Sequence, residues 1–166
     1  DNRIVLACTW YAEEMKRPGC VWTHSLIFNV EDLLLMETDT ASIIGVFQKP
    51  SFDNDFSYYG KALKIKKTNK EQLDETNLKY LIWCIWGNKN PLIIYDDKST
   101  NLEKEILFFF LTQHDLVGAD FSFCTGSVSL RAYEGQIMQL QVVPSKISRS
   151  KLGVGKRTYE AKNKNI

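Results

Sequence analysis

The chain has 166 residues, of which 44% are hydrophobic and 25% are charged, with a formal net charge of +1. This composition is typical of a globular domain, and no apolar run approaches the roughly 18 residues that a membrane-spanning helix needs. Residues 145–166 carry a charge of +6 and residues 1–144 carry −5, which argues against a nucleic-acid-binding core. We therefore expect one globular domain over residues 1–144 and a basic tail or linker to a missing domain over residues 145–166.

The first predicted elements are two strands. Residues 3–9 form a short run rich in branched apolar side chains, and residues 20–28 form a second run after the turn signal at residues 17–19. Period two places alternate residues of the second strand on a common face. That face carries Cys20, Trp22, His24, Leu26 and Phe28.

Weaker patterns follow the two strands. Asn29 and the acidic residues after it predict a capped short helix over residues 30–36. Residues 43–47 predict a further strand, residues 49–61 a loop, and residues 62–67 a short strand.

Two longer helices are predicted from their caps. Residues 68–71 have capping-box spacing, and an apolar helical face then extends to Gly87, for which we expect a left-handed C-terminal cap. Residues 100–103 repeat the capping-box spacing before a second apolar helix that extends to Gln113.

The remaining strands are predicted over residues 92–95, 121–127 and 136–143, the last ending at Pro144. Together these elements predict an α+β fold with a mixed sheet of about five to six strands, two main helices and one short helix. The pattern leaves the strand order open.

The cysteines predict neither a disulfide framework nor a metal site. Cys8, Cys20, Cys84 and Cys124 lie far apart without a CxxC motif, and only two histidines accompany them. Cys20 and His24 share a strand face, but a zinc site needs two further ligands that the pattern does not supply. We expect reduced thiols in a cytoplasmic protein, with no metal and no cofactor.

Three stretches carry a resemblance to a bacterial family. They are residues 17–27 with 32–33, residues 85–87 with 91–94, and residues 121–127 closing on residues 140–144. The chain resembles the type 1 N-terminal domain of the GTPase-associated protein family, found beside predicted NTPases in conflict-system operons. Residues 113–116 depart from the family pattern, because they lack its tryptophan and proline.

The resemblance implies an adaptor or regulatory domain within a multidomain protein, and no established reaction comes with it. The chain has no GxxxxGK[ST] phosphate loop, so a GTPase or another P-loop NTPase would be its partner. We expect further domains of the same longer protein as additional partners, and no membrane partner. The leading hypothesis is a non-catalytic protein-interaction domain of a bacterial defence or conflict system.

A Cys-His hydrolase is the alternative. Cys124 would be the nucleophile and His24 the base that activates it, and the amides of residues 125–127 would stabilise an oxyanion. The order of the two residues is similar to that in circularly permuted papain-like enzymes. Because both residues lie among apolar or aromatic neighbours, burial in the core is the competing interpretation.

Two further surfaces are candidates for binding. Arg17 and Arg131, with the backbone amides of Gly19 and Gly126, have the chemistry to bind a phosphate or carboxylate, which would make the domain an anion or nucleotide-ligand sensor. Each arginine can equally pair with a carbonyl or an acid. A separate aromatic stretch predicts either a partner surface or a satellite core. It comprises Phe52, Phe56, Tyr58 and Tyr59.

Overall fold

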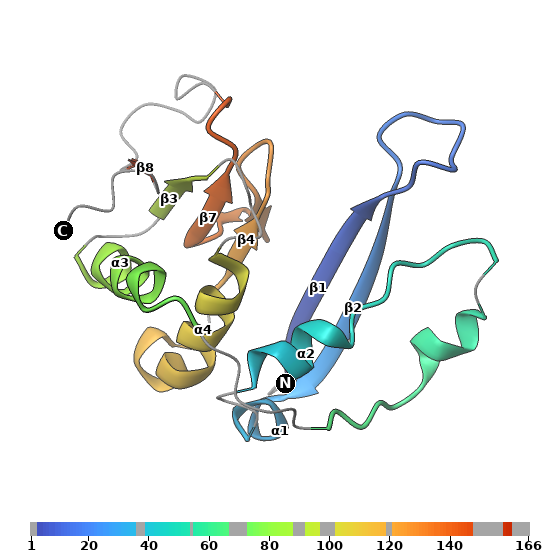
Figure 1. The fold of residues 1–166 in the computed structure, drawn as a ribbon, viewed down its shortest axis with the longest axis horizontal. Helices are drawn as coiled ribbons and strands as arrows, with labels where there is room; N and C mark the ends of the chain where they lie inside the picture. Colours follow the sequence, from blue (N-terminus) through green and yellow to red (C-terminus); the bar gives the residue numbers. More distant parts are fainter. Residues whose placement is uncertain are drawn as a thin grey trace. The chain divides into compact units, whose positions relative to one another are not determined.

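The computed structural model describes residues 3–35, 39–53, 55–66, 73–87, 92–96, 102–118, 121–147 and 158–160. The predicted α+β class is confirmed, with the strands distributed over three sheets. The chain forms two compact units, residues 1–71 and residues 72–166, and each is described by itself (Figure 1). The expected single domain over residues 1–144 stays a prediction.

The first unit is built on an antiparallel hairpin of β1 (Arg3–Tyr11) and β2 (Val21–Asn29). The two strands pair without interruption over nine residues each, so both predicted strands are confirmed. The amide of Ala12 donates to the carbonyl of Cys20 at 3.0 Å at the base of the turn. Gly19 has a φ of +81°, a left-handed conformation that favours glycine and lets the chain reverse here.

Alternation along β2 divides the hairpin into two faces. His24 and Leu26 are buried, and Trp22 and Phe28 are half-buried, which confirms the predicted apolar face. We call this the inner face. The side chains that point the other way are exposed.

Two short helices follow the hairpin, α1 (Val30–Leu34) and α2 (Thr40–Gly45). α1 confirms the predicted short helix, although Asn29 makes no side-chain cap bond and instead donates to Asp32 at 3.1 Å. α2 contradicts the strand predicted over residues 43–47. The carboxylate of Asp39 accepts from the amide of Ser42 at 3.0 Å and starts a helix, and a short apolar run fits either element.

The rest of the first unit is largely irregular. A 3-10 helix, η1 (Phe56–Gly60), lies within the predicted loop, and Asp55 caps it by accepting from the amide of Ser57. The strand predicted over residues 62–67 is wrong for its described part, because residues 62–66 join no sheet. The Ser42 hydroxyl donates to the Lys66 carbonyl at 2.9 Å, so a side chain holds this segment.

The second unit contains a parallel sheet with the order β4-β7-β3-β8. Its strands are β3 (Leu92–Tyr95), β4 (Phe123–Thr125), β7 (Leu140–Val143) and β8 (Thr158–Glu160). The first three confirm predicted strands, with shorter bounds for β4 and β7. β8 lies within the segment expected to be a tail or linker, and its backbone pairs with β3.

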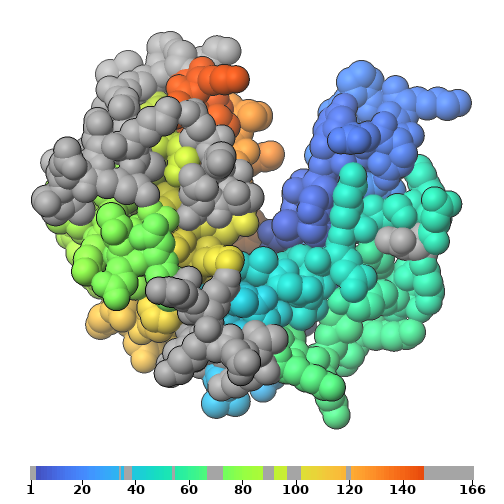
Figure 2. All heavy atoms as spheres, in the orientation of Figure 1, coloured from blue at the N-terminus to red at the C-terminus, as the bar shows by residue number. Residues whose placement is uncertain are grey.

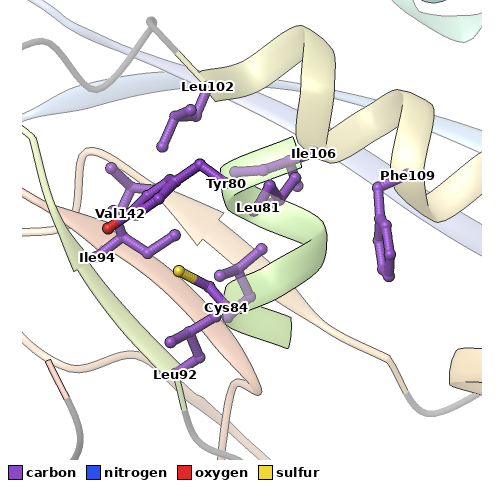
Figure 3. Close-up of a cluster of buried hydrophobic side chains, with 10 residues drawn as sticks. Tyr80, Leu81, Cys84, Leu92, Ile94, Leu102, Ile106, Phe109 and Val142 are labelled. Atoms are coloured by element: carbon purple, nitrogen blue, oxygen red, sulfur yellow. The ribbon is translucent and has the colours of Figure 1, made fainter. Parts of the chain in front are cut away.

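Helices α3 (Glu75–Trp86) and α4 (Glu103–Val117) pack on this sheet. Figure 3 shows side chains from both helices converging on β3 and β7. The core comprises Tyr80, Leu81, Cys84, Leu92, Ile94, Leu102, Ile106, Phe109, Leu140 and Val142. The alternate strand residues Ile93, Tyr95 and Val143 form a smaller cluster with Leu130 and Ile147. The central strands β3 and β7 are therefore buried on both faces, as their continuous apolar sequences require.

The helix ends differ from their predicted caps. Asp74 caps α3 by accepting from the amides of Thr76 and Asn77, whereas the predicted capping box at residues 68–71 lies outside the described residues. Thr100 of the second box lies outside them too. Gly87 has a φ of −76°, so the predicted left-handed cap is wrong. Glycine fits there for another reason, because an added Cβ would lie 2.7 Å from the Trp83 carbonyl oxygen.

A small hairpin connects β4 to β7. It consists of β5 (Ala132–Tyr133) and β6 (Gln136–Ile137), which pair antiparallel. The two turn residues, Glu134 and Gly135, have φ values of +49° and +80°. Positive φ at both positions is typical of the tight turns whose twist matches that of the flanking strands.

Candidate functional site

His24 lies at the centre of an aromatic cluster on the inner face of the hairpin. It is only 4% exposed. The rings of Phe47, Tyr58 and Tyr59 lie 5.5, 5.8 and 4.9 Å from the imidazole, centroid to centroid, in edge-to-face arrangements. The segment after α2 therefore folds back over the strand, and in Figure 2 its teal and green atoms continue the surface of the blue hairpin.

A hydrogen bond fixes the protonation state of His24. The backbone amide of Gln48 donates to its Nδ1 at 3.1 Å, so Nδ1 must be unprotonated and the neutral ring carries its proton on Nε2. Burial lowers the pKa of His24, which favours the same neutral form. The Tyr58 hydroxyl donates to the Val46 carbonyl at 3.0 Å and ties down the same segment. His24 thus serves as a buried acceptor that anchors residues 46–60.

The cluster continues to a partly exposed edge. The Trp22 ring contacts Phe52 at 5.5 Å and Phe56 at 6.2 Å, and Phe56 contacts Tyr59 at 6.2 Å. We call Trp22, Phe52, Phe56 and Tyr59 the aromatic patch. Phe52 is 62% exposed and Phe56 is 50% exposed. The aromatic stretch therefore shows features of both predicted alternatives, since its tyrosines pack on His24 while its phenylalanines face solvent.

Two ionised carboxylates flank the aromatic patch. The Trp22 indole donates to Glu14 at 2.5 Å, and a backbone hydrogen bond, this indole and the charge of Lys49 lower the pKa of Glu14. Asp55 accepts from the hydroxyl and the amide of Ser57, and these two bonds lower its pKa. The exposed aromatic rings are therefore bordered by negatively charged groups, as the polar rim of an interface would be.

Cys124 lies on β4 in the second unit and is half-buried. Burial raises the pKa of its thiol, while the charge of Arg131 and a hydrogen bond to Ser127 act in the opposite direction with smaller effect. The thiol lies 3.8 Å from the carbonyl oxygen of Thr125, an acceptor that suits a protonated sulfur. His24 belongs to the first unit, where its Nδ1 already accepts a hydrogen bond. Neither this imidazole nor the Cys124 thiol has the surroundings typical of an activated Cys-His pair.

The predicted anion-binding residues are also divided between the units. Arg17 and Gly19 lie in the exposed turn between β1 and β2, and Arg131 and Gly126 lie in the second unit. The buried side chain of Gln141 fixes the backbone of Arg131 by accepting from its amide at 2.8 Å and donating to its carbonyl at 3.1 Å. Gln141 therefore holds the backbone of Arg131 in place. The charge of the Arg131 guanidinium acts to lower the pKa of the Cys124 thiol.

Several polar residues that bond to the candidate site residues could not be predicted from sequence patterns. Gln48 and Glu14 contact His24 and Trp22 from segments without any motif. Glu103 accepts from the Thr125 hydroxyl at 3.2 Å, and burial raises the pKa of this carboxyl. Within the described residues no group of three His, Cys, Asp or Glu side chains is placed to hold a metal ion, and no helix there is long and apolar enough to span a membrane.

Comparison with known proteins gives one match. Residues 1–47 match the family model of GTPase-associated protein 1, N-terminal domain type 1, which confirms the resemblance over that segment. The match covers β1, β2, α1 and α2, and so includes Trp22 and His24 but not the exposed phenylalanines. No curated protein and no solved structure matches the chain.

Proposed function

We propose that this chain is a non-catalytic interaction domain through which a longer protein acts together with a GTPase or another P-loop NTPase. The match of residues 1–47 to a GTPase-associated domain carries the proposal. We propose further that it serves as a regulatory adaptor in a bacterial defence or conflict system, in the cytoplasm. The GTPase supplies the chemistry in this scheme, and this chain supplies the contact.

The aromatic patch is the proposed contact surface. Exposed aromatic side chains contribute strongly to protein interfaces because they bury large rigid surfaces at low cost in conformational entropy. Phe52 and Phe56 are held by Trp22, and Trp22 is held by Glu14, so the exposed rings are pre-positioned. Pre-positioning reduces the entropy lost when a partner binds.

The chemistry of the predicted catalytic residues supports a non-catalytic role. A base must have an accessible lone pair, whereas Nδ1 of His24 already accepts from Gln48. A nucleophile needs a thiolate, whereas burial raises the pKa of Cys124. The hydrolase alternative would require both environments to change.

Co-purification with a candidate GTPase from the same organism tests the proposal. The tagged full chain is co-expressed with that GTPase, and the complex is measured by size-exclusion chromatography and calorimetry with GDP and with a non-hydrolysable GTP analogue. We expect a stable complex in at least one nucleotide state. The variant Phe56→Ala should weaken it about tenfold or more, since aromatic anchors at interfaces commonly contribute about 2 kcal/mol or more.

The variant Tyr133→Ala is the matched control, because it removes an exposed aromatic ring from the second unit. It should leave the affinity unchanged. Absence of a complex in both nucleotide states would refute the association with the GTPase. Equal binding by wild type and Phe56→Ala would refute the aromatic patch as its contact surface.

A further inference from the structure

The edge of β1 that faces away from β2 presents a row of backbone hydrogen-bonding groups. The amide of Ala12 donates to the carbonyl of Cys20, and this pair continues the register of the hairpin. Opposite residues in an antiparallel pair alternate between hydrogen-bonded and non-hydrogen-bonded, so every second residue of β1, counted back from Ala12, bonds to β2. The residues between them direct their amides and carbonyls away from β2. These residues are Arg3, Val5, Ala7, Thr9 and Tyr11.

This outward-facing backbone is available for pairing. Among the residues that the structure describes, none forms a hydrogen bond with the backbone groups that Val5, Ala7, Thr9 and Tyr11 direct away from β2. All four of these residues are exposed. Their donors and acceptors repeat every two residues along an extended line, and the element that matches this repeat is another β-strand. The hydrogen-bonding pattern therefore identifies a strand as the occupant of the edge.

β1 also lacks the features by which natural proteins protect a free edge. Such edges typically carry lysine, proline or a β-bulge. β1 pairs with β2 in continuous register over its nine residues, and residues 4–11 contain no charged residue, proline or glycine. A hairpin of only two strands is marginally stable in water. An added strand would therefore stabilise the first unit.

The opposite edge of the hairpin, on β2, is more restricted. β2 runs from Asn29 directly into α1, and this helix contacts the strand. The segment that covers the inner face is also attached to β2, through the bond from Gln48 to His24 and through the ring contacts of Trp22. Trp10 lies opposite Trp22 in the register and has no ring contact with a described residue. β1 is therefore the strand with the more accessible edge.

The sequence of β1 is complementary to itself in an antiparallel arrangement. Ala7 is the middle one of the nine residues, so two copies of β1 that pair over their full length place Ala7 opposite Ala7. In this register the outward-facing groups of both copies meet and form about ten hydrogen bonds, the number found in a typical protein interface. Arg3 is the only charged residue of β1 and would lie opposite Tyr11, so no like charges meet.

The same register brings apolar side chains together on the inner face. Ile4 and Trp10 are only half-buried. They would lie opposite each other in the two copies, and a β-branched residue opposite an aromatic one stabilises antiparallel strands. Leu6 would lie opposite Cys8, so every inward-facing position of β1 meets an apolar partner. A second copy therefore buries apolar surface that the hairpin alone leaves partly exposed.

We propose that two copies of this chain pair antiparallel through their β1 edges, centred on Ala7, and form a continuous four-stranded sheet of order β2-β1-β1-β2. The inference goes beyond the proposed function and does not depend on it. The aromatic patch is attached to β2, the strand away from the pairing edge, so each copy keeps its own patch for a partner.

Sedimentation velocity of the full chain over a range of concentrations tests the proposal. We expect a monomer–dimer equilibrium for the wild type. Ala7→Lys and Ala7→Glu each place two like charges directly opposite each other, and each should weaken the dimer about tenfold or more. An equimolar mixture of the two variants should restore a dimer with one copy of each, because opposite charges then meet. Circular dichroism checks that both variants fold.

Ser25→Lys is the matched control. Ser25 is exposed, lies opposite Ala7 within the hairpin and is the middle residue of β2, so the variant adds the same charge at the other edge. It should dimerise as the wild type does. A wild-type chain that stays monomeric would overturn the proposal. Equal weakening by Ser25→Lys and Ala7→Lys, or a mixture of Ala7→Lys and Ala7→Glu that does not restore the dimer, would also overturn it.

Oxidative cross-linking tests the register by a second route. In Ala7→Cys the two Cα atoms at position 7 would lie about 5.5 Å apart, a separation that a disulfide can bridge. We expect a dimer joined through position 7, identified by mass spectrometry of the linked peptides. Ser25→Cys should give no dimer joined through position 25. Absence of the link through position 7, or a link through position 25, would overturn the proposal.

Discussion

The variant His24→Phe isolates the hydrogen bond between His24 and Gln48. Phenylalanine keeps an aromatic ring against Phe47, Tyr58 and Tyr59 but offers no acceptor to the Gln48 amide. Leaving a buried donor without a partner costs about 1–3 kcal/mol. Since about 1.4 kcal/mol corresponds to a factor of ten, the Gln48 amide should exchange with solvent roughly 5- to 150-fold faster in the variant.

The burial of His24 predicts that the free energy of unfolding depends on pH. Burial lowers the pKa of His24 in the folded protein below its value in the unfolded chain, so the unfolded chain takes up the proton first. The stabilisation that neutral, buried His24 contributes is therefore complete above the pKa of about 6.5 that its imidazole has in the unfolded chain. It is lost as the pH falls from there through the lower pKa of His24 in the folded protein. His24→Phe should lack this dependence.

Amide exchange followed by NMR, with intrinsic rates corrected for pH, measures both effects at Gln48. His24→Asn is the matched control, because its side-chain oxygen can replace Nδ1 as acceptor while the ring contacts are lost. His24→Asn should therefore protect the Gln48 amide from exchange more than His24→Phe does. Equal protection of Gln48 in the wild type and His24→Phe, or protection that increases as the pH falls below 6.5, would refute the assigned acceptor role.

Three further predictions concern side chains of the second unit. Burial raises the pKa of the Cys124 thiol, so its alkylation should be slow at pH 7 and should accelerate only above about pH 8.5. The rate should be the same in His24→Ala. Fast alkylation at pH 7 that is lost in His24→Ala would support the Cys-His hydrolase instead. Gln141→Leu removes both bonds to the Arg131 backbone and should lower the free energy of unfolding by about 1–3 kcal/mol in urea titrations, and no change would contradict the bonding. Phe109→Ala empties a fully buried position in the second unit and should cost about 3–5 kcal/mol, whereas a cost below about 1 kcal/mol would show that this core is loosely packed.

Much of the regular structure could be predicted from local patterns. β1, β2 and β3 were recognisable because branched apolar residues cluster between turn signals, and period two correctly placed His24 on the covered face. α2 was missed because six residues are too few to separate a helical from an extended pattern, and its start depends on Asp39. β8 was missed because its three residues lie in a basic segment and pair only through long-range contact with β3.

The candidate site was only partly predictable. The sequence indicated Trp22, His24 and the aromatic stretch as separate features, and the fold brings them together. The contact of Gln48 with His24 joins residues 24 positions apart and follows from the path of a loop, for which no residue pattern exists. The surroundings of Cys124 depend likewise on burial and on the Arg131 loop, which composition and spacing do not encode.

Hydrogen–deuterium exchange of the full chain, with and without the proposed GTPase partner, tests whether the first unit forms the contact surface. We predict that a bound GTPase protects residues 21–29 and 46–60, and that Phe56→Ala abolishes the protection of residues 46–60 at concentrations that saturate the wild type. Unchanged exchange in both segments while the GTPase is bound would contradict the proposed contact surface, because the contact would then lie elsewhere on the chain.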